Sequence, residues 1–143
     1  MVTPNELVAR LKKTWHKMDG IYSDYAKKMG VNFTTILILE CLNDVSKNYT
    51  QKELCSYLEI PKQLVNAIIK SMWQEGYVIL KEAHDRRNKE IILTPKGADY
   101  VASILQPLEA AELASWADFT SDELEKLIAC MDRYTAALKQ RLS

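Results

Sequence analysis

The sequence predicts a mainly α-helical fold with one small β-hairpin. Apolar residues recur at helical spacing through most of the 143 residues, and the period changes only around residues 77–94. Three threonine–glutamate capping boxes mark helix starts, which supports the same interpretation. The length suits one domain with a core of its own, so we expect residues 1–143 to form a single domain.

The first predicted helix begins at a capping box and ends at a glycine. Thr3 is its N-cap, Pro4 suits its first turn, Glu6 completes the capping box, and Gly30 stops the helix. Apolar residues spaced by three and four positions form a stripe along one face of this helix, and an apolar stripe of this length usually faces another helix. The stripe consists of Leu7, Leu11, Trp15, Met18, Tyr22, Tyr25 and Met29.

Three further helices are predicted before the hairpin. Asn32 caps a helix over residues 33–43, and a second capping box at residues 50–53 opens a short helix. Pro61 ends that short helix, because proline disfavours helical geometry in the residue before it, and Pro61 itself fits the first turn of a helix over residues 61–74. Two helices therefore meet at a tight corner.

The helix over residues 61–74 has two chemically different faces. One face is apolar and predicts burial, through Leu64, Val65, Ile68, Ile69 and Met72. The other face carries amides and lysines, namely Lys62, Gln63, Asn66 and Lys70.

Two apolar runs after this helix predict strands at residues 77–81 and 90–94. The polar loop between them forms the tip of a hairpin and carries the basic residues Arg86, Arg87 and Lys89. Thr94 and Pro95 then cap and start another helix, and a third capping box at residues 120–123 opens the last one.

Two helices at a corner followed by a basic hairpin predict a winged helix-turn-helix. Its chemistry suits double-stranded DNA, because Gln and Asn read adenine edges, Lys holds phosphates or reads guanine, and arginines on a loop reach phosphates or the minor groove. The chain has no net charge, but residues 60–97 carry +3 and residues 98–143 carry −4. We therefore expect attraction to a polyanion to be local.

The stretch DRRNKEIILTPKG resembles the wing signature of the MarR (multiple antibiotic resistance regulator) family. The matching positions are Asp85, Arg87, Leu93, Thr94, Lys96 and Gly97. The stretch TQKELCSYLEIPKQLVNAIIKSMWQEGYV is similar to the helix-turn-helix of the same family, including the bulky Met72 four residues before Gly76. The resemblance covers nearly the whole chain.

The resemblance implies a homodimer whose N- and C-terminal helices, residues 1–30 and 98–143, interlock, and a DNA-binding lobe over residues 33–97. It implies a recognition helix from Pro61 to Gln74 and a wing on which Arg87 contacts the minor groove or backbone. Asp85 would orient Arg87 or a neighbour through a charge-assisted hydrogen bond.

This chain departs from the family pattern at two places, which affect the expected preference for a DNA sequence rather than the expected fold. Leu80 and Lys81 stand where the family often has an arginine. The recognition helix starts with Pro61 rather than Ser or Thr.

The family commonly holds a small molecule between its dimer helices and its DNA-binding lobe. The residues of the first helix that suit such a pocket are Trp15, Met18 and Tyr22. For each aromatic residue of this stripe, Tyr25 included, we favour a simpler interpretation, in which the side chain packs in the core or in the dimer interface. A small-molecule effector therefore stays an open alternative.

The three cysteines suit neither a disulfide framework nor a zinc site. Oxidation-sensing members of the family carry a reactive cysteine in the first helix, where this chain has none. Cys41 and Cys55 are expected in the apolar core, and Cys130 is the best redox candidate.

Other function classes find little support. His16 and His84 are far apart without ligand partners, four scattered glycines form no phosphate loop, and no catalytic set assembles. We expect no enzyme, metal or cofactor. With no apolar stretch long enough for a membrane helix and no signal peptide, we expect a cytoplasmic protein without membrane contact.

The sequence thus predicts a sequence-specific transcriptional regulator, a dimeric and ligand-responsive repressor of a pseudo-palindromic operator. Two alternatives stay open. One is a winged-helix module that binds an acidic protein, and the other is a thiol-switched regulator.

Overall fold

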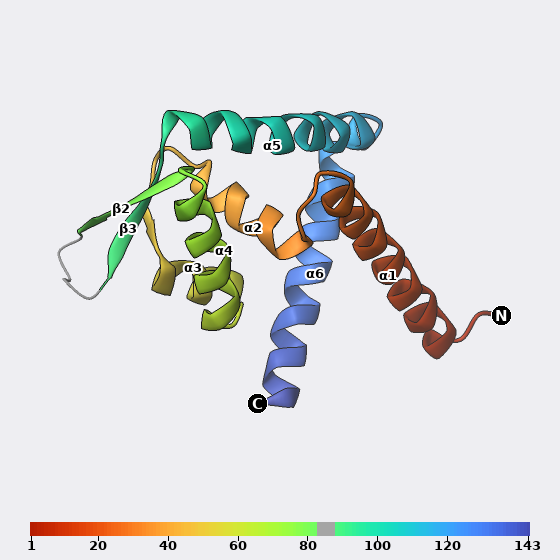
Figure 1. Cartoon of the computed structure of the whole chain (residues 1–143). Coiled ribbons are helices and arrows are strands. Elements are labelled where there is room, and N and C mark those ends of the chain that lie inside the picture. The colour runs from red at the N-terminus through yellow and green to blue at the C-terminus, as the bar shows by residue number, and fades with distance from the viewer. Residues whose placement is uncertain (83–87) are drawn as a thin grey trace. The chain divides into compact units, whose positions relative to one another are not determined.

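The computed structural model describes residues 1–82 and 88–143 and contains six helices and three strands in these ranges (Figure 1). The chain divides into two compact units, residues 1–106 and 107–143. The helices are α1 (Pro4–Lys28), α2 (Phe33–Leu42), α3 (Gln51–Leu58), α4 (Lys62–Gln74), α5 (Pro95–Trp116) and α6 (Ser121–Leu142). The strands are β1 (Tyr49–Thr50), β2 (Val78–Glu82) and β3 (Lys89–Leu93).

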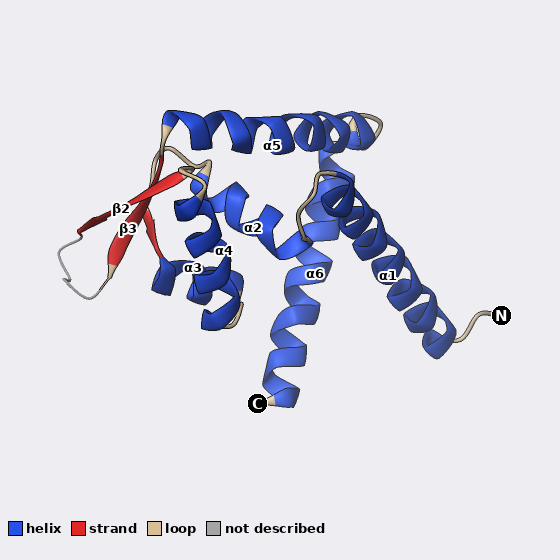
Figure 2. Cartoon of the chain, viewed as in Figure 1, coloured by secondary structure: helices blue, strands red, loops and turns tan. Residues whose placement is uncertain are grey.

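The mainly helical fold with a hairpin is confirmed, and the strands form one small antiparallel sheet of order β1-β3-β2 (Figure 2). In the hairpin Val78 pairs with Leu93 and Glu82 with Lys89. The third strand, β1, is absent from our prediction. It pairs Tyr49 with Ile91, and its two residues are too few to show a period in the sequence.

The predicted helix starts are confirmed by their hydrogen bonds. In each of three capping boxes the threonine hydroxyl accepts from a backbone N–H three residues later, and the glutamate accepts from the threonine N–H. The pairs are Thr3 with Glu6, Thr50 with Glu53, and Thr120 with Glu123. Asn32 caps α2 by accepting from the N–H of Thr35.

The corner between α3 and α4 is built differently from our prediction. The chain reverses at Glu59, which adopts the left-handed conformation with φ 53° and ψ 46°. Pro61 is the N-cap of α4 rather than its first residue, with φ −56° and ψ 140°. The turn therefore lies two residues earlier than the proline, where the sequence offers no glycine to signal it.

The core of the first unit lies between α2, α3, α4, the sheet and the first half of α5. Its fully buried side chains include Ile36, Ile38, Leu39, Leu54, Val65, Ile69, Val78, Val101, Ile104 and Leu105. Tyr25 ties α1 to this core, since its hydroxyl donates a hydrogen bond of 2.7 Å to the carbonyl of Ile104. This contact supports a structural role for that tyrosine.

Four residues join the base of the hairpin to the start of α5. The hydroxyl of Thr94 donates to the carbonyl of Gly76 (2.6 Å) and accepts from the N–H of Gly97 (3.0 Å), while the N–H of Thr94 donates to the carbonyl of Tyr77 (3.0 Å). We call Gly76, Tyr77, Thr94 and Gly97 the hairpin clamp. It fixes the start of β2, the end of β3 and the first turn of α5 together.

Candidate nucleic-acid interface

The exposed face of α4 carries the four predicted contact residues of the helix. Burial of Val65, Ile69 and Met72, which are at most 4% exposed, sets the rotation of α4 about its axis. The opposite side chains then point to solvent, and they include Lys62, Gln63, Asn66 and Lys70. Our expectation for Leu64 was wrong, because its side chain is 48% exposed rather than buried.

Trp73 lies on this same exposed face. It follows Lys70 by three residues and Asn66 by seven, which places the three side chains in one row along the helix. The indole is 56% exposed. The polar face of α4 thus ends in an aromatic residue.

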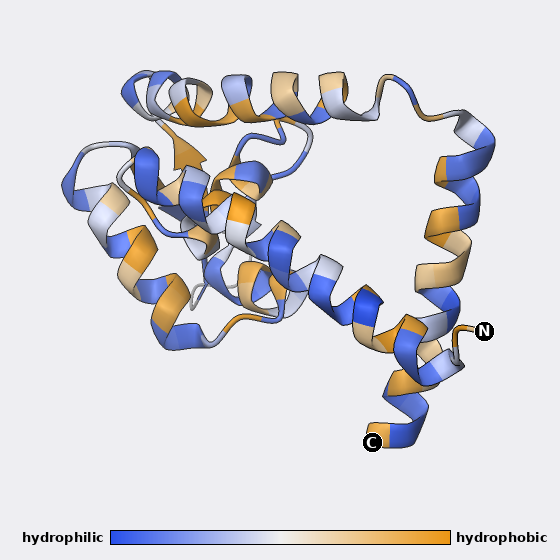
Figure 3. Ribbon diagram, turned by 90° about the vertical axis from the view of Figure 1, so that its right-hand side faces the viewer, coloured by the Kyte–Doolittle hydropathy of each residue, from blue (hydrophilic) through white to orange (hydrophobic). Residues whose placement is uncertain are grey.

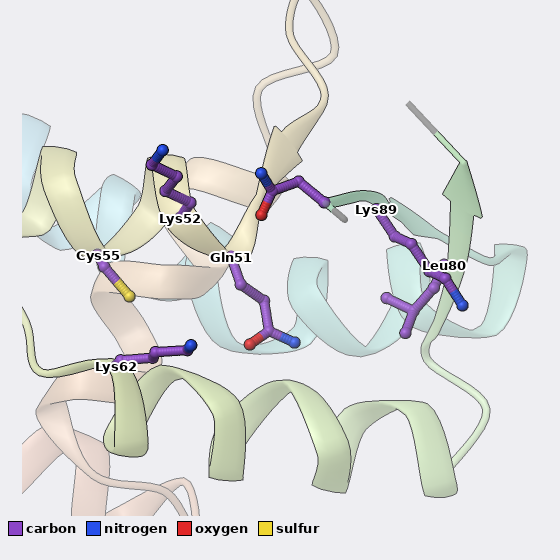
Figure 4. A pocket seen from close by; sticks show the side chains of 7 residues that line it. Gln51, Lys52, Cys55, Lys62, Leu80 and Lys89 are labelled. Carbon is purple, nitrogen blue, oxygen red and sulfur yellow. The ribbon is translucent and has the colours of Figure 1, made fainter. Parts of the chain in front are cut away.

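A cavity of about 490 Å³ opens beside the first turn of α4 (Figure 4). Gln51 reaches into it from α3 and Lys62 from α4, while Leu80 and Lys89 border it from β2 and β3 (Figure 4). The complete lining is Gln51, Lys52, Cys55, Lys62, Leu80, Asn88 and Lys89. The fold therefore brings two predicted contact residues from separate elements, Lys62 and Lys89, to one place.

The sequence prediction omitted Gln51, Lys52 and Asn88 from this site. Gln51 and Lys52 occupy the first turn of α3, immediately after the Thr50 cap, so the capping box was the available signal. The prediction for Cys55 was also wrong, because its side chain is partly exposed and lines this charged cavity instead of the apolar core.

The wing residues Asp85, Arg86 and Arg87 lie outside the described residues. The roles that the sequence suggests for them therefore stay predictions. The strands that lead to them are described up to Glu82 and from Asn88 onward.

A second cavity, of about 640 Å³, lies on another side of α4 and meets the turn after α1 and the start of α5. Ala67, Ile68 and Ser71 line it from α4, and Tyr77 and Tyr100 line it with rings stacked at 4.1 Å. Trp15, Met18 and Tyr22, the predicted pocket residues, do not line it. Tyr22 instead packs its ring 5.5 Å from that of Phe33, so the pocket proposed for these three stays a prediction.

The cysteines differ in environment. Cys41 is buried, and burial together with the charges of Glu40 and Asp44 raises the pKa of its thiol, which keeps it protonated. Cys130 is exposed on α6. In residues 1–82 and 88–143, no three His, Cys, Asp or Glu side chains gather as a metal site, and no helix there is long and apolar enough to cross a membrane.

Known proteins share both sequence and fold with this chain. A sequence model of the MarR family matches residues 29–88. The HTH-type transcriptional regulator SarZ of Staphylococcus epidermidis is 25% identical over 114 residues, which are 79% of this chain and 75% of SarZ. The HTH-type transcriptional regulator YwoH of Bacillus subtilis is 30% identical over 88 residues, which are 62% of this chain and 64% of YwoH.

Solved structures agree with these sequence matches. NMB1585, a MarR family regulator from Neisseria meningitidis, superposes with a TM-score of 0.81 at 20% identity and covers 95% of this chain and 96% of its own. MepR of Staphylococcus aureus, solved as a DNA complex, superposes with a TM-score of 0.70 at 16% identity over 96% of this chain and 99% of its own. The fold and the matched helix-turn-helix confirm the resemblance seen in the sequence: residues 29–88 match the MarR family, and the chain has the fold of that family's winged helix-turn-helix regulators.

Proposed function

We propose that this regulator binds double-stranded DNA as a homodimer and represses transcription by occluding a pseudo-palindromic operator. The observation that carries the proposal is the exposure of Lys62, Gln63, Asn66 and Lys70 on α4, a helix that is anchored in the core by Val65, Ile69 and Met72. Amides on such a face read adenine edges in the major groove, and lysines hold phosphates. A MarR-family relative of the same fold, MepR, was solved with DNA.

Apolar side chains that the chain leaves in solvent support the proposed homodimer. Leu113, Ile128 and Leu142 are 74%, 58% and 77% exposed, and α6 has no buried residue. Hydrophobic positions recur along the C-terminal helix (Figure 3). A second copy would cover such positions and would set the two α4 helices about 34 to 36 Å apart, one turn of B-DNA.

Since the proposed partner is chromosomal DNA, we place the protein in the cytoplasm.

Ligand response would act through α4. The cavity of about 640 Å³ is lined by Ala67 and Ser71 of α4, which directly follow Asn66 and Lys70 of the exposed face. A small molecule there changes DNA affinity only if it binds the DNA-competent and incompetent dimers unequally. The effect of a ligand on operator affinity, and the reciprocal effect of operator on ligand affinity, must then have the same magnitude.

Fluorescence anisotropy with the duplex upstream of the protein's own gene tests DNA binding. The native protein is expected to bind this duplex more tightly than a random one, with log affinity falling linearly against log salt concentration. Asn66→Ala should reduce the preference for the operator, whereas Arg86→Ala/Arg87→Ala should weaken binding to both duplexes. Equal, weak binding of both duplexes by all three proteins would remove the proposal for that operator and favour an acidic protein partner.

A thiol switch is tested in the same assay. Peroxide should leave operator affinity unchanged in the native protein and in Cys130→Ser if no thiol controls binding. A loss of affinity that Cys130→Ser abolishes would establish the redox alternative.

A further inference from the structure

Among the described residues, the charged side chains that line the cavity beside the first turn of α4 are all positive. Lys52, Lys62 and Lys89 contribute three ammonium groups, and no acidic side chain of residues 1–82 or 88–143 lines it. None of these lysines forms an ion pair with another residue in the described ranges 1–82 and 88–143. Like charges gathered at one cavity repel one another, and a bound anion would turn that repulsion into attraction.

Two helix starts add to the positive potential. Gln51 and Lys52 are the first residues of α3, and Lys62 is the first residue of α4. The first backbone N–H groups of a helix carry partial positive charge. Pro61, the N-cap of α4, makes no side-chain capping hydrogen bond to these N–H groups.

The remaining lining suits an oxyanion. The amide groups of Gln51 and Asn88 donate hydrogen bonds. Figure 4 shows the side chains of Gln51 and Lys62 extending into the cavity from two different helices. The volume of about 490 Å³ exceeds that of a phosphate group, which leaves room for an adjoining sugar.

The cavity also adjoins the proposed DNA-reading face, because Lys62 belongs to both. A DNA strand bordering the groove that α4 enters would pass over it. Half or more of the hydrogen bonds between proteins and DNA go to the backbone.

We propose that this cavity holds one phosphate group of the DNA backbone, with Lys62 and Lys89 as its charge partners and Gln51 and Lys52 as contacts from α3. This inference rests on the proposed DNA binding. In this arrangement Gln51 and Lys52 of α3, together with Asn88 beside β3, position the DNA backbone. The Cys55 thiol then lies beneath the bound DNA strand.

The first test measures the salt dependence of duplex binding by Lys52→Gln. Loss of one phosphate contact in each subunit should make the dependence of log affinity on log salt less steep, by about 0.9 per subunit and so about 1.8 for the dimer, and should weaken operator and random duplexes alike. Lys12→Gln, which removes the same charge from the exposed surface of α1, is the matched control and should leave the slope unchanged. Equal slopes for native protein and Lys52→Gln would overturn the proposal.

The second test uses Cys55 as a reporter of occupancy. N-ethylmaleimide labelling, followed by peptide mass spectrometry, should show Cys55 protected by bound duplex in proportion to saturation. Cys130, exposed on α6, is the internal control and should label at an unchanged rate. Inorganic phosphate should protect Cys55 only at far higher concentration than duplex.

The outcomes separate the two proposals. If native protein binds no duplex by anisotropy, the proposed function fails. If duplex binds but Cys55 labels equally fast, the cavity holds no backbone phosphate although the DNA-binding function stands. Protection by inorganic phosphate but not by bound duplex would assign the cavity to a free anion and would overturn the DNA assignment.

Discussion

Gly97 is a residue whose identity the structure requires. A Cβ at this position would lie 1.8 Å from the carbonyl oxygen of Tyr77 and 2.7 Å from its carbon. Both atoms are backbone, and the same oxygen accepts the hydrogen bond from Thr94. No rotamer change can relieve this contact, so the hairpin clamp closes only around a glycine.

Replacement of Gly97 by alanine is therefore expected to destabilise the protein by about 1–3 kcal/mol or more, as overpacking does. Gly20 is the matched control, because nothing lies within 4 Å of a Cβ there and it is inside α1. Gly20→Ala should stabilise by about 1 kcal/mol through helix propensity. Urea unfolding followed by circular dichroism measures both, and changes of the same sign would contradict the close approach at Gly97.

Glu59 is a residue in an unfavourable backbone conformation. Its φ of 53° lies in the left-handed region, where a side chain costs about 1–2 kcal/mol and glycine costs nothing. Glu59→Gly should relieve more strain than the added freedom of the unfolded chain costs, for a net gain of about 1 kcal/mol. Glu75→Gly, at a right-handed C-cap with φ −78°, should lower stability instead. Thermal unfolding of the two variants gives the comparison, and a loss of stability in both would refute strain at Glu59.

At the scale of the element, the capping boxes that open α3 and α6 respond to pH. The backbone N–H of Thr50 donates to Glu53 and lowers the pKa of its carboxyl below the ordinary 4.5, and the Thr120 N–H lowers the pKa of Glu123 in the same way. A lowered folded pKa means that the unfolded chain binds protons more readily. The stability contributed by each carboxylate is thus complete above pH 4.5 and is lost as pH falls through the folded pKa.

Glu53→Gln tests this linkage. Glutamine retains the capping hydrogen bond but has no charge to titrate. The fall in melting temperature between about pH 6 and about pH 3 should be smaller for Glu53→Gln than for native protein. Glu125→Gln, on exposed α6, controls for removal of a negative charge alone. An unchanged pH dependence in Glu53→Gln would show that the Thr50 capping bond does not hold the carboxylate in its charged form.

Element starts were predictable from the sequence because capping is local chemistry. Thr3, Thr50 and Thr120 each bond within three residues, so the motif alone locates the helix. The strand β1 and the environment of Cys55 were not predictable. Strand β1 depends on Ile91, about 40 positions further along the chain, and the environment of Cys55 depends on Asn88 and Lys89, about 35 positions further along. No local sequence pattern connects residues so far apart.

The candidate site was predictable in part for the same reason. Helical spacing places Lys62, Gln63, Asn66 and Lys70 on one face, which the structure shows. Helical spacing did not predict that α3 places Gln51 and Lys52 beside these residues. The angle between α3 and α4 depends on the backbone of Glu59, which helical spacing does not describe.

At the scale of the whole molecule, the chain carries apolar surface that it does not bury itself. In residues 107–143 only Leu108 is buried. Contiguous exposed apolar side chains usually mark an interaction surface. The exposed large apolar side chains of this segment are Leu113, Trp116, Phe119, Leu127, Ile128, Tyr134, Leu138 and Leu142.

Ile128→Asp is expected to shift the protein toward monomer, because it would bury a charge in the proposed dimer contact. Gln140→Asp introduces the same charge at a polar position of α6 and should leave the dimer intact. Sedimentation equilibrium measures the association, and anisotropy should show weaker operator binding by Ile128→Asp, since a monomer engages one half-site. An Ile128→Asp protein as dimeric as Gln140→Asp would place the dimer contact elsewhere.

The hairpin clamp bears on how such a regulator changes during evolution. Thr94 and Gly97 close the base of the hairpin against Gly76 and Tyr77, and five strand pairs, from Val78–Leu93 to Glu82–Lys89, extend it. The residues that hold this base, Gly76, Tyr77, Thr94 and Gly97, lie outside the segment between Glu82 and Asn88 that carries the predicted arginine contacts. In a duplicated copy, those predicted contacts can therefore be altered without substitution of any residue of the hairpin clamp.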